Sequence, residues 1–102
     1  MSKITAEACH AFENAYVGNY KKSNTNVIRY DDLRAEMYLH GNLIAYSNAD
    51  GIFISDGDYR EGLTRTTKER LNGLTGVHIQ QRNFASYLNG EEWNGDWIKI
   101  AD

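Results

Sequence analysis

The stretch that decides the fold is residues 34–55, RAEMYLHGNLIAYSNADGIFIS. Over Arg34–His40, apolar residues alternate with polar or amphipathic ones, which is the pattern of a strand with one buried face. Gly41-Asn42 and residues 47–51 are rich in the residues that favour tight turns. Loops of two to five residues join antiparallel neighbours, so this stretch predicts an antiparallel meander. Its expected strands are 34–40, 43–46 and 52–55.

Outward from the meander, the N-terminal side predicts a helix and one more strand. Residues 4–16 place Ile4, Ala8, Phe12 and Tyr16 at the helical spacing of four, and a glycine at position 18 would end the helix. The polar stretch 18–26 is expected to be a loop, and 26–30 a short strand.

The C-terminal side predicts a second short helix followed by more strands. In TTKERLNGL, Thr66 and Glu69 fit a capping box, and Leu71 and Leu74 form a narrow apolar stripe. The fold class expected for residues 1–102 is therefore a single α+β domain. Its N-terminal helix packs on a mainly antiparallel sheet, and the short second helix precedes the C-terminal strands. Those strands are expected at 77–80, 84–88, 91–93 and 97–100.

The composition excludes several classes of protein. The chain has 102 residues, no proline, one cysteine and a net charge of −3. One cysteine cannot form an internal disulfide, so a reducing compartment such as a cytoplasm is expected. No apolar run approaches the roughly 18 residues of a transmembrane helix, so we expect neither a membrane-spanning helix nor a secretory signal.

Candidates for catalysis or metal binding are weak. Cys9 borders the apolar stripe of the first helix and is expected to be buried. The histidines at positions 10, 40 and 78 lack metal-ligand spacing. Asp56 and Asp58 flank a glycine, but position twelve of a calcium loop would be Thr67, so a solvated turn is favoured. No phosphate-binding or nucleophile motif is present. We expect no enzyme activity, metal or cofactor, and a hydrolase centred on Cys9 or on the histidines is the third hypothesis.

Three blocks resemble a family of small, uncharacterised bacteriophage accessory proteins: MYLHGNLIAY at 37–46, TTKERLNGL at 66–74 and YLNGEEWNGDWIKI at 87–100. The resemblance implies a protein made inside an infected bacterium. Such proteins often bind and inhibit a host or defence-system protein, including CRISPR effectors. The leading hypothesis is therefore a non-catalytic inhibitor that occludes a basic site on its partner. Unpaired strand edges would also allow a homodimer.

The C-terminal segment offers an aromatic and acidic surface for such a partner. Tryptophan and tyrosine dominate binding hot spots, and acidic residues around them would suit a basic surface. Trp97 lies in an alternating strand and is expected in the core, whereas Trp93 suits the core and the interface equally. The expected partner-binding residues are Trp93, Glu91, Glu92, Asp96, Tyr87, Asp56 and Asp58.

Basic residues in and around the second helix support an alternative. Together with nearby aromatic side chains they could bind a nucleic acid or a nucleotide-like ligand. An amphipathic helix with a solvated polar face explains the same residues, and the negative net charge weighs against nucleic acid. The expected ligand-binding residues are Arg65, Lys68, Arg70, Arg82 and Tyr59, with Arg60 beside them.

Overall fold

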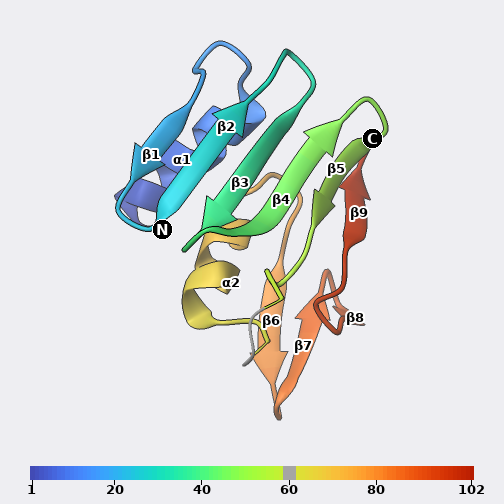
Figure 1. The fold of residues 1–102 in the computed structure, drawn as a ribbon. Helices are drawn as coiled ribbons and strands as arrows, with labels where there is room; N and C mark the ends of the chain where they lie inside the picture. Colours follow the sequence, from blue (N-terminus) through green and yellow to red (C-terminus); the bar gives the residue numbers. More distant parts are fainter. Residues whose placement is uncertain (59–61) are drawn as a thin grey trace.

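The computed structural model describes residues 1–58 and 62–102, so Tyr59, Arg60 and Glu61 lie outside the described residues. It has the predicted α+β fold, but its strands form two sheets (Figure 1). A six-stranded antiparallel sheet has the order β1-β2-β3-β4-β5-β9, and a small three-stranded sheet has the order β6-β7-β8. The helices are Lys3–Glu13 (α1) and Arg65–Asn72 (α2), and the strands are Tyr20–Lys22 (β1), Thr25–Arg29 (β2), Ala35–Leu39 (β3), Asn42–Asn48 (β4), Gly51–Ile54 (β5), Ile79–Arg82 (β6), Ala85–Leu88 (β7), Glu91–Glu92 (β8) and Ile98–Ala101 (β9).

The predicted meander is confirmed as β3, β4 and β5. Ala35, Met37 and Leu39 are buried, and the residues between them lie on the outer face of the sheet. The register pairs Met37 with Ala45 and Ala45 with Ile54, so these buried residues form one row across the sheet. The two-residue period of a strand sets one face toward α1 and leaves the other face open.

Helix α1 covers the inner face of the sheet but ends earlier than predicted. Its last residue is Glu13, and Asn14 is extended, with its side-chain oxygen accepting the N–H of Tyr16 at 3.0 Å. A side chain that bonds nearby backbone competes with the helix, so Tyr16 leaves the apolar stripe and is fully exposed. Arg29 of β2 donates to the carbonyl of Phe12 at 2.6 Å, which satisfies the helix end. No helix among the described residues has both the length and the apolar character needed to cross a membrane.

Strand β1 was predicted as a loop. It is a short edge strand that pairs with β2, and Tyr20 donates a hydrogen bond to Glu7 of α1 at 3.0 Å. Residues 20–22 are mostly polar because lysines suit an exposed sheet edge. They therefore lack the alternation of apolar and polar residues by which a strand is recognised in a sequence.

Helix α2 does not have the predicted capping box. It begins at Arg65, and the N-cap Thr64 accepts the N–H of Thr67 at 3.1 Å. Glu69 turns instead to α1, where it accepts hydrogen bonds from the backbone N–H and hydroxyl of Ser2 at 3.1 Å and from the Thr5 hydroxyl. The predicted stripe of leucines at 71 and 74 is confirmed, because both are buried.

Arg70 is the buried charge at the junction of α1, α2 and β2. Its side chain donates to the hydroxyl of Thr5 at 2.7 Å, to the hydroxyl of Thr25 at 2.9 Å and to the carbonyl of Asn24 at 3.3 Å, and it pairs with Glu69. With 6% of its surface exposed, it is unavailable to a ligand, so its predicted role in ligand binding is wrong. Its helical position alone could not reveal this, because the partners lie on other elements.

Replacing Arg70 should therefore unfold the protein more readily. We expect Arg70→Leu to lower the free energy of unfolding by about 3–5 kcal/mol, since it leaves polar partners buried without their donor. Urea denaturation followed by circular dichroism measures this. The control is Arg65→Leu, at an exposed position of the same helix, which should change stability by about 0.5 kcal/mol or less. Equal effects of the two variants would contradict a structural role for Arg70.

Glu69 should make the stability sensitive to acid. Burial raises the pKa of Glu69, but hydrogen bonds from Thr5 and Ser2 and the charge of Arg70 outweigh it, so the pKa lies below its ordinary value. A lowered folded-state pKa adds stability above the unfolded pKa of about 4.3, and this stability is lost as the pH falls through the folded pKa.

Glu69→Gln should therefore be less stable than the wild type at neutral pH, with a gap that narrows on acidification. Urea denaturation at a series of pH values tests this. The pKa values of Asp31 and Asp102 are also lowered, by hydrogen bonds from Arg34 and Lys99. These residues are the same in the wild type and in Glu69→Gln, so they contribute equally to the acid sensitivity of both. A gap that stays constant through the acid range would refute the contribution of Glu69.

Candidate functional site

The small sheet ends in a hairpin turn that projects an aromatic side chain. Arg82 pairs with Ala85, so Asn83 and Phe84 form a two-residue turn between β6 and β7. Both have positive φ, 51° and 67°, as the type I′ turn of a tight hairpin requires. Phe84 was predicted as the first residue of a strand. It lies in the turn because asparagine adopts the left-handed conformation readily and so starts the turn one residue earlier.

Phe84 is exposed and conformationally unfavourable. Its relative exposure is 111%, and a left-handed conformation costs an ordinary residue about 1–2 kcal/mol. The other turn of this sheet places Gly90 at its second position, where glycine carries no such cost. Stability therefore gives no reason for phenylalanine at position 84.

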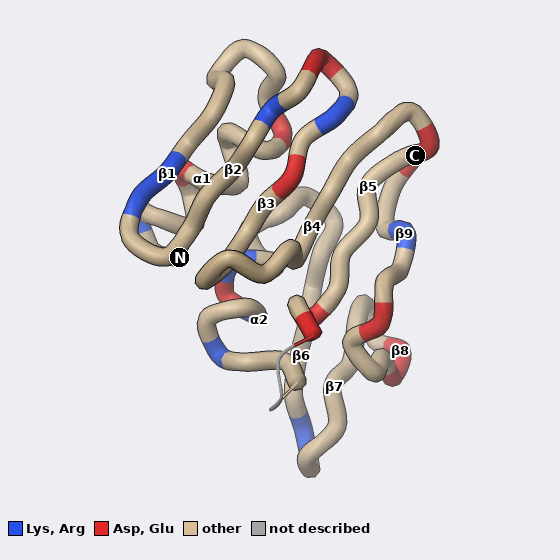
Figure 2. The backbone as a smooth tube through the Cα atoms, viewed as in Figure 1, with Lys and Arg blue, Asp and Glu red and all other residues tan. Residues whose placement is uncertain are grey.

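Most of the predicted acidic residues lie on β8 and in the segment before β9, at the end of the small sheet away from the Phe84 turn. Glu91, Glu92 and Asp96 are exposed, and Figure 2 shows acidic positions on β8 and before β9. Asp56 approaches them because its N–H donates to the carbonyl of Gly95 at 2.9 Å. Asp56, Glu92, Trp93 and Phe84 line a hollow of about 330 Å³. Among the residues that the structure describes, none of these acidic side chains forms an ion pair.

Asp56 and Asp58 form a turn, as the sequence favoured. The Asp56 side chain accepts the N–H of Asp58 at 2.8 Å, and Asp58 has a φ of 57°. Gly95 is required beside this turn, since a Cβ there would lie 2.2 Å from a carboxylate oxygen of Asp56. Within the described chain, no group of three acidic, histidine or cysteine side chains could hold a metal ion.

The two tryptophans lie in different environments, and only Trp97 departs from the expected one. Trp93 is 7% exposed, and its indole N–H donates to the carbonyl of Asp96 at 2.9 Å, so it belongs to the core. Trp97 is 45% exposed and contacts the ring of Tyr46 edge-on at 5.0 Å, so its predicted burial is wrong. The reason is that alternate residues of a strand face opposite sides of the sheet. Ile100 packs against the core, and Trp97, three residues earlier, therefore faces the other side.

One pair of side chains joins the two predicted binding surfaces, the acidic and aromatic one and the basic one. The guanidinium of Arg82 lies over the ring of Tyr87 at 4.9 Å. Such a pair contributes about 0.5–1 kcal/mol at an exposed site. Arg65 is exposed and Lys68 half-buried, but without Arg70 the predicted basic surface loses its centre. Tyr59 and Arg60 fall outside the described residues.

The predicted burial of Cys9 is confirmed. Its thiol donates to the carbonyl of Arg70 at 3.2 Å, and burial, assisted by the charge of Glu13, raises its pKa to about 12. A thiol with this pKa stays protonated at neutral pH, so it is a poor nucleophile. The histidines at 10, 40 and 78 are all exposed, as expected for surface or turn residues.

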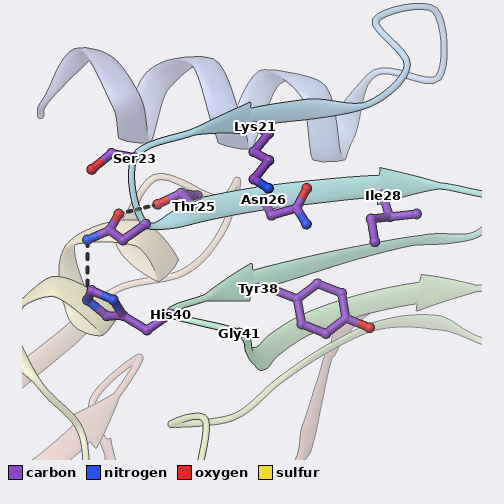
Figure 3. A pocket seen from close by; sticks show the side chains of 9 residues that line it. Lys21, Ser23, Thr25, Asn26, Ile28, Tyr38, His40 and Gly41 are labelled. Carbon is purple, nitrogen blue, oxygen red and sulfur yellow. Dashed lines mark hydrogen bonds between the residues drawn. The ribbon is translucent and has the colours of Figure 1, made fainter.

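Sequence reasoning missed the open face of the large sheet. Tyr46 and Phe53 stack there with ring centroids 4.8 Å apart, and Tyr30 and Tyr38 both donate to Glu36, at 2.6 and 2.8 Å. Beside Tyr38 lies a pocket between the turns that follow β1 and β3 (Figure 3). The signal was present in the meander, where aromatic residues occupy the positions between the buried ones.

The different environments of the tryptophans predict different effects of mutation. Trp93→Ala should lower the free energy of unfolding by about 3–5 kcal/mol, whereas Trp97→Ala should lower it by about 1.5 kcal/mol or less. Urea denaturation followed by circular dichroism compares them. In Trp97→Phe the remaining Trp93 should emit at short wavelength and resist iodide quenching. If iodide quenched Trp93, the core would not extend to the segment between β8 and β9.

Comparison with known proteins concerns nearly the whole chain. The family model described as Kyanoviridae Gp96 protein matches residues 1–100. No curated protein and no solved structure matches the chain. The bacteriophage origin indicated by the three sequence blocks is thus confirmed at the level of the family. The chain belongs to the Kyanoviridae Gp96 family of phage proteins.

Proposed function

We propose that this protein is a non-catalytic phage accessory protein that binds a host or defence-system protein, such as a CRISPR effector, and inhibits it. The binding surface is formed by the β6–β7 turn together with the acidic residues of β8 and of the segment before β9. It covers a basic site on the partner. Phe84 takes the anchoring role that the sequence suggested for Trp93.

The observation that carries this proposal is the exposure of Phe84 at positive φ. A phenylalanine side chain contributes about 1.5–3 kcal/mol when it passes from water into an apolar pocket. In the free protein this gain is absent, while the backbone strain remains. A partner pocket that receives the ring would recover the cost, and binding hot spots are enriched in large aromatic anchors of this kind.

The acidic residues on and beside the small sheet support a basic partner, and two of them, Asp56 and Glu92, share a hollow with Phe84. Glu91, Glu92 and Asp96 are exposed and form no ion pair with a described residue, so they are free to face positive charge. Complementary charge at the rim of an interface raises the association rate and excludes unsuitable partners. The anchor and the rim together resemble the usual arrangement of an apolar centre with a polar border.

Phe84→Gly tests the proposal because it separates binding from stability. Glycine relieves the strain at positive φ and removes the anchor. We expect the free energy of unfolding to stay equal or rise by up to about 1 kcal/mol, and partner binding to fall by about tenfold or more. Thermal denaturation measures the first effect.

Site-specific photocrosslinking in infected cells measures the second. A benzophenone amino acid at position 84 should capture one predominant host protein with a basic surface. The matched control carries it at Tyr16, an equally exposed aromatic position. Glu91→Lys, Glu92→Lys and Asp96→Lys together should reduce the capture at position 84. The same capture from both positions, or its persistence after charge reversal, would overturn the proposal.

A further inference from the structure

The pocket in Figure 3 is donor-rich and lies far from the proposed protein-binding end. Its volume is about 440 Å³, and its lining includes Lys21, Asn24, Asn26, Tyr38 and His40. None of its described lining residues is acidic, whereas each of four other hollows on the described surface includes at least one carboxylate. In a protein with net charge −3, such a site favours an anion.

Strand register places one lysine in this pocket and its neighbour outside. Lys21 pairs with Asn26, whose side chain lies on the open face, and both line the pocket. Lys22 pairs with the buried Thr25 and so belongs to the opposite face. Lys21 forms no ion pair with a described residue, so its charge is available to a ligand.

The network of Arg70 orients a second donor. The side-chain carbonyl of Asn24 accepts hydrogen bonds from Thr25 at 2.8 Å and from Arg70 at 3.3 Å. Its amide nitrogen therefore points away from the core, toward the ring of His40 at 3.4 Å (Figure 3). Ser23 and His40, in the two adjoining turns, both have positive φ, of 56° and 50°. Tight two-residue hairpin turns require this conformation, so the two turns hold Asn24 and His40 in place beside the pocket.

Tyr38 supplies an aromatic wall of fixed orientation. Its hydroxyl donates to Glu36 at 2.8 Å, and Ile28 lines the pocket beside it. Burial and the neighbouring carboxylate raise the pKa of Tyr38 to about 12, so the phenol remains a donor at neutral pH. A ring held in this way offers a surface on which a planar group can stack.

We propose that this pocket binds a small planar anion of the nucleoside monophosphate class. The base would stack on Tyr38 against Ile28, and the phosphate would bind the ammonium group of Lys21 and the amide groups of the two asparagines. The site differs from the basic helix that the sequence suggested for nucleotides. It also does not depend on the proposed partner-binding surface.

Calorimetric titration of the full chain with AMP, GMP, CMP and UMP tests this inference, with adenosine and inorganic phosphate as partial ligands. At least one nucleotide should bind about tenfold more tightly than either partial ligand, because stacking and phosphate contacts act together. No binding of any nucleotide at about 1 mM would overturn the proposal. Equal binding of inorganic phosphate would overturn it too, since the ring would then play no part.

Variants assign the binding to the pocket. Lys21→Gln and Tyr38→Leu should each weaken nucleotide binding about fivefold or more, whereas Lys22→Gln and Tyr38→Phe should change it less than about twofold. Circular dichroism confirms that each variant is folded. Equal losses for the Lys21 and Lys22 variants would mean that the nucleotide binds elsewhere. Phe84→Gly should leave nucleotide binding unchanged, so the two proposals fail independently.

Discussion

The fold depends on a buried arginine at the junction of two helices and the large sheet. A guanidinium group removed from water must find partners for its donors, and Arg70 finds them on α1, on β2 and beside β2. The helices also approach closely because residue 73 lacks a side chain. A Cβ there would lie 2.6 Å from Thr5 and 2.7 Å from the thiol of Cys9. Glycine and arginine together therefore set how α2 packs on α1.

This packing decides which surfaces remain free. Both helices contact the inner side of the large sheet, so its aromatic outer face stays open. The chain after α2 forms the small sheet, which extends beyond the large one and carries the Phe84 turn away from the core (Figure 1). Arg70 also orients Asn24 at the donor-rich pocket. One buried side chain thus links the stability of the core to the geometry of a surface site.

Local pattern predicted the parts of the fold in which burial follows the strand or helix period. The meander is the clearest example, because Met37 and its alternate neighbours face one side whatever else the chain does. The same reasoning failed for Trp97. In a short alternating strand either set of alternate residues can face the core, and the sequence does not say which set does. It failed also for Glu69, which fits a capping box yet accepts hydrogen bonds from Ser2 and Thr5, more than sixty positions away.

The candidate surfaces show the same division. The sequence by itself determined the α+β class, the order of most elements and the gathering of acidic residues near the C-terminus. It also indicated the phage family. Only the tertiary structure decided that Arg70 and Trp93 are buried, that Phe84 is exposed in a turn, and that Lys21 and Tyr38 share a pocket. Local propensity reflects neighbours along the chain, whereas the burial of a long polar or aromatic side chain depends on elements that meet only after folding.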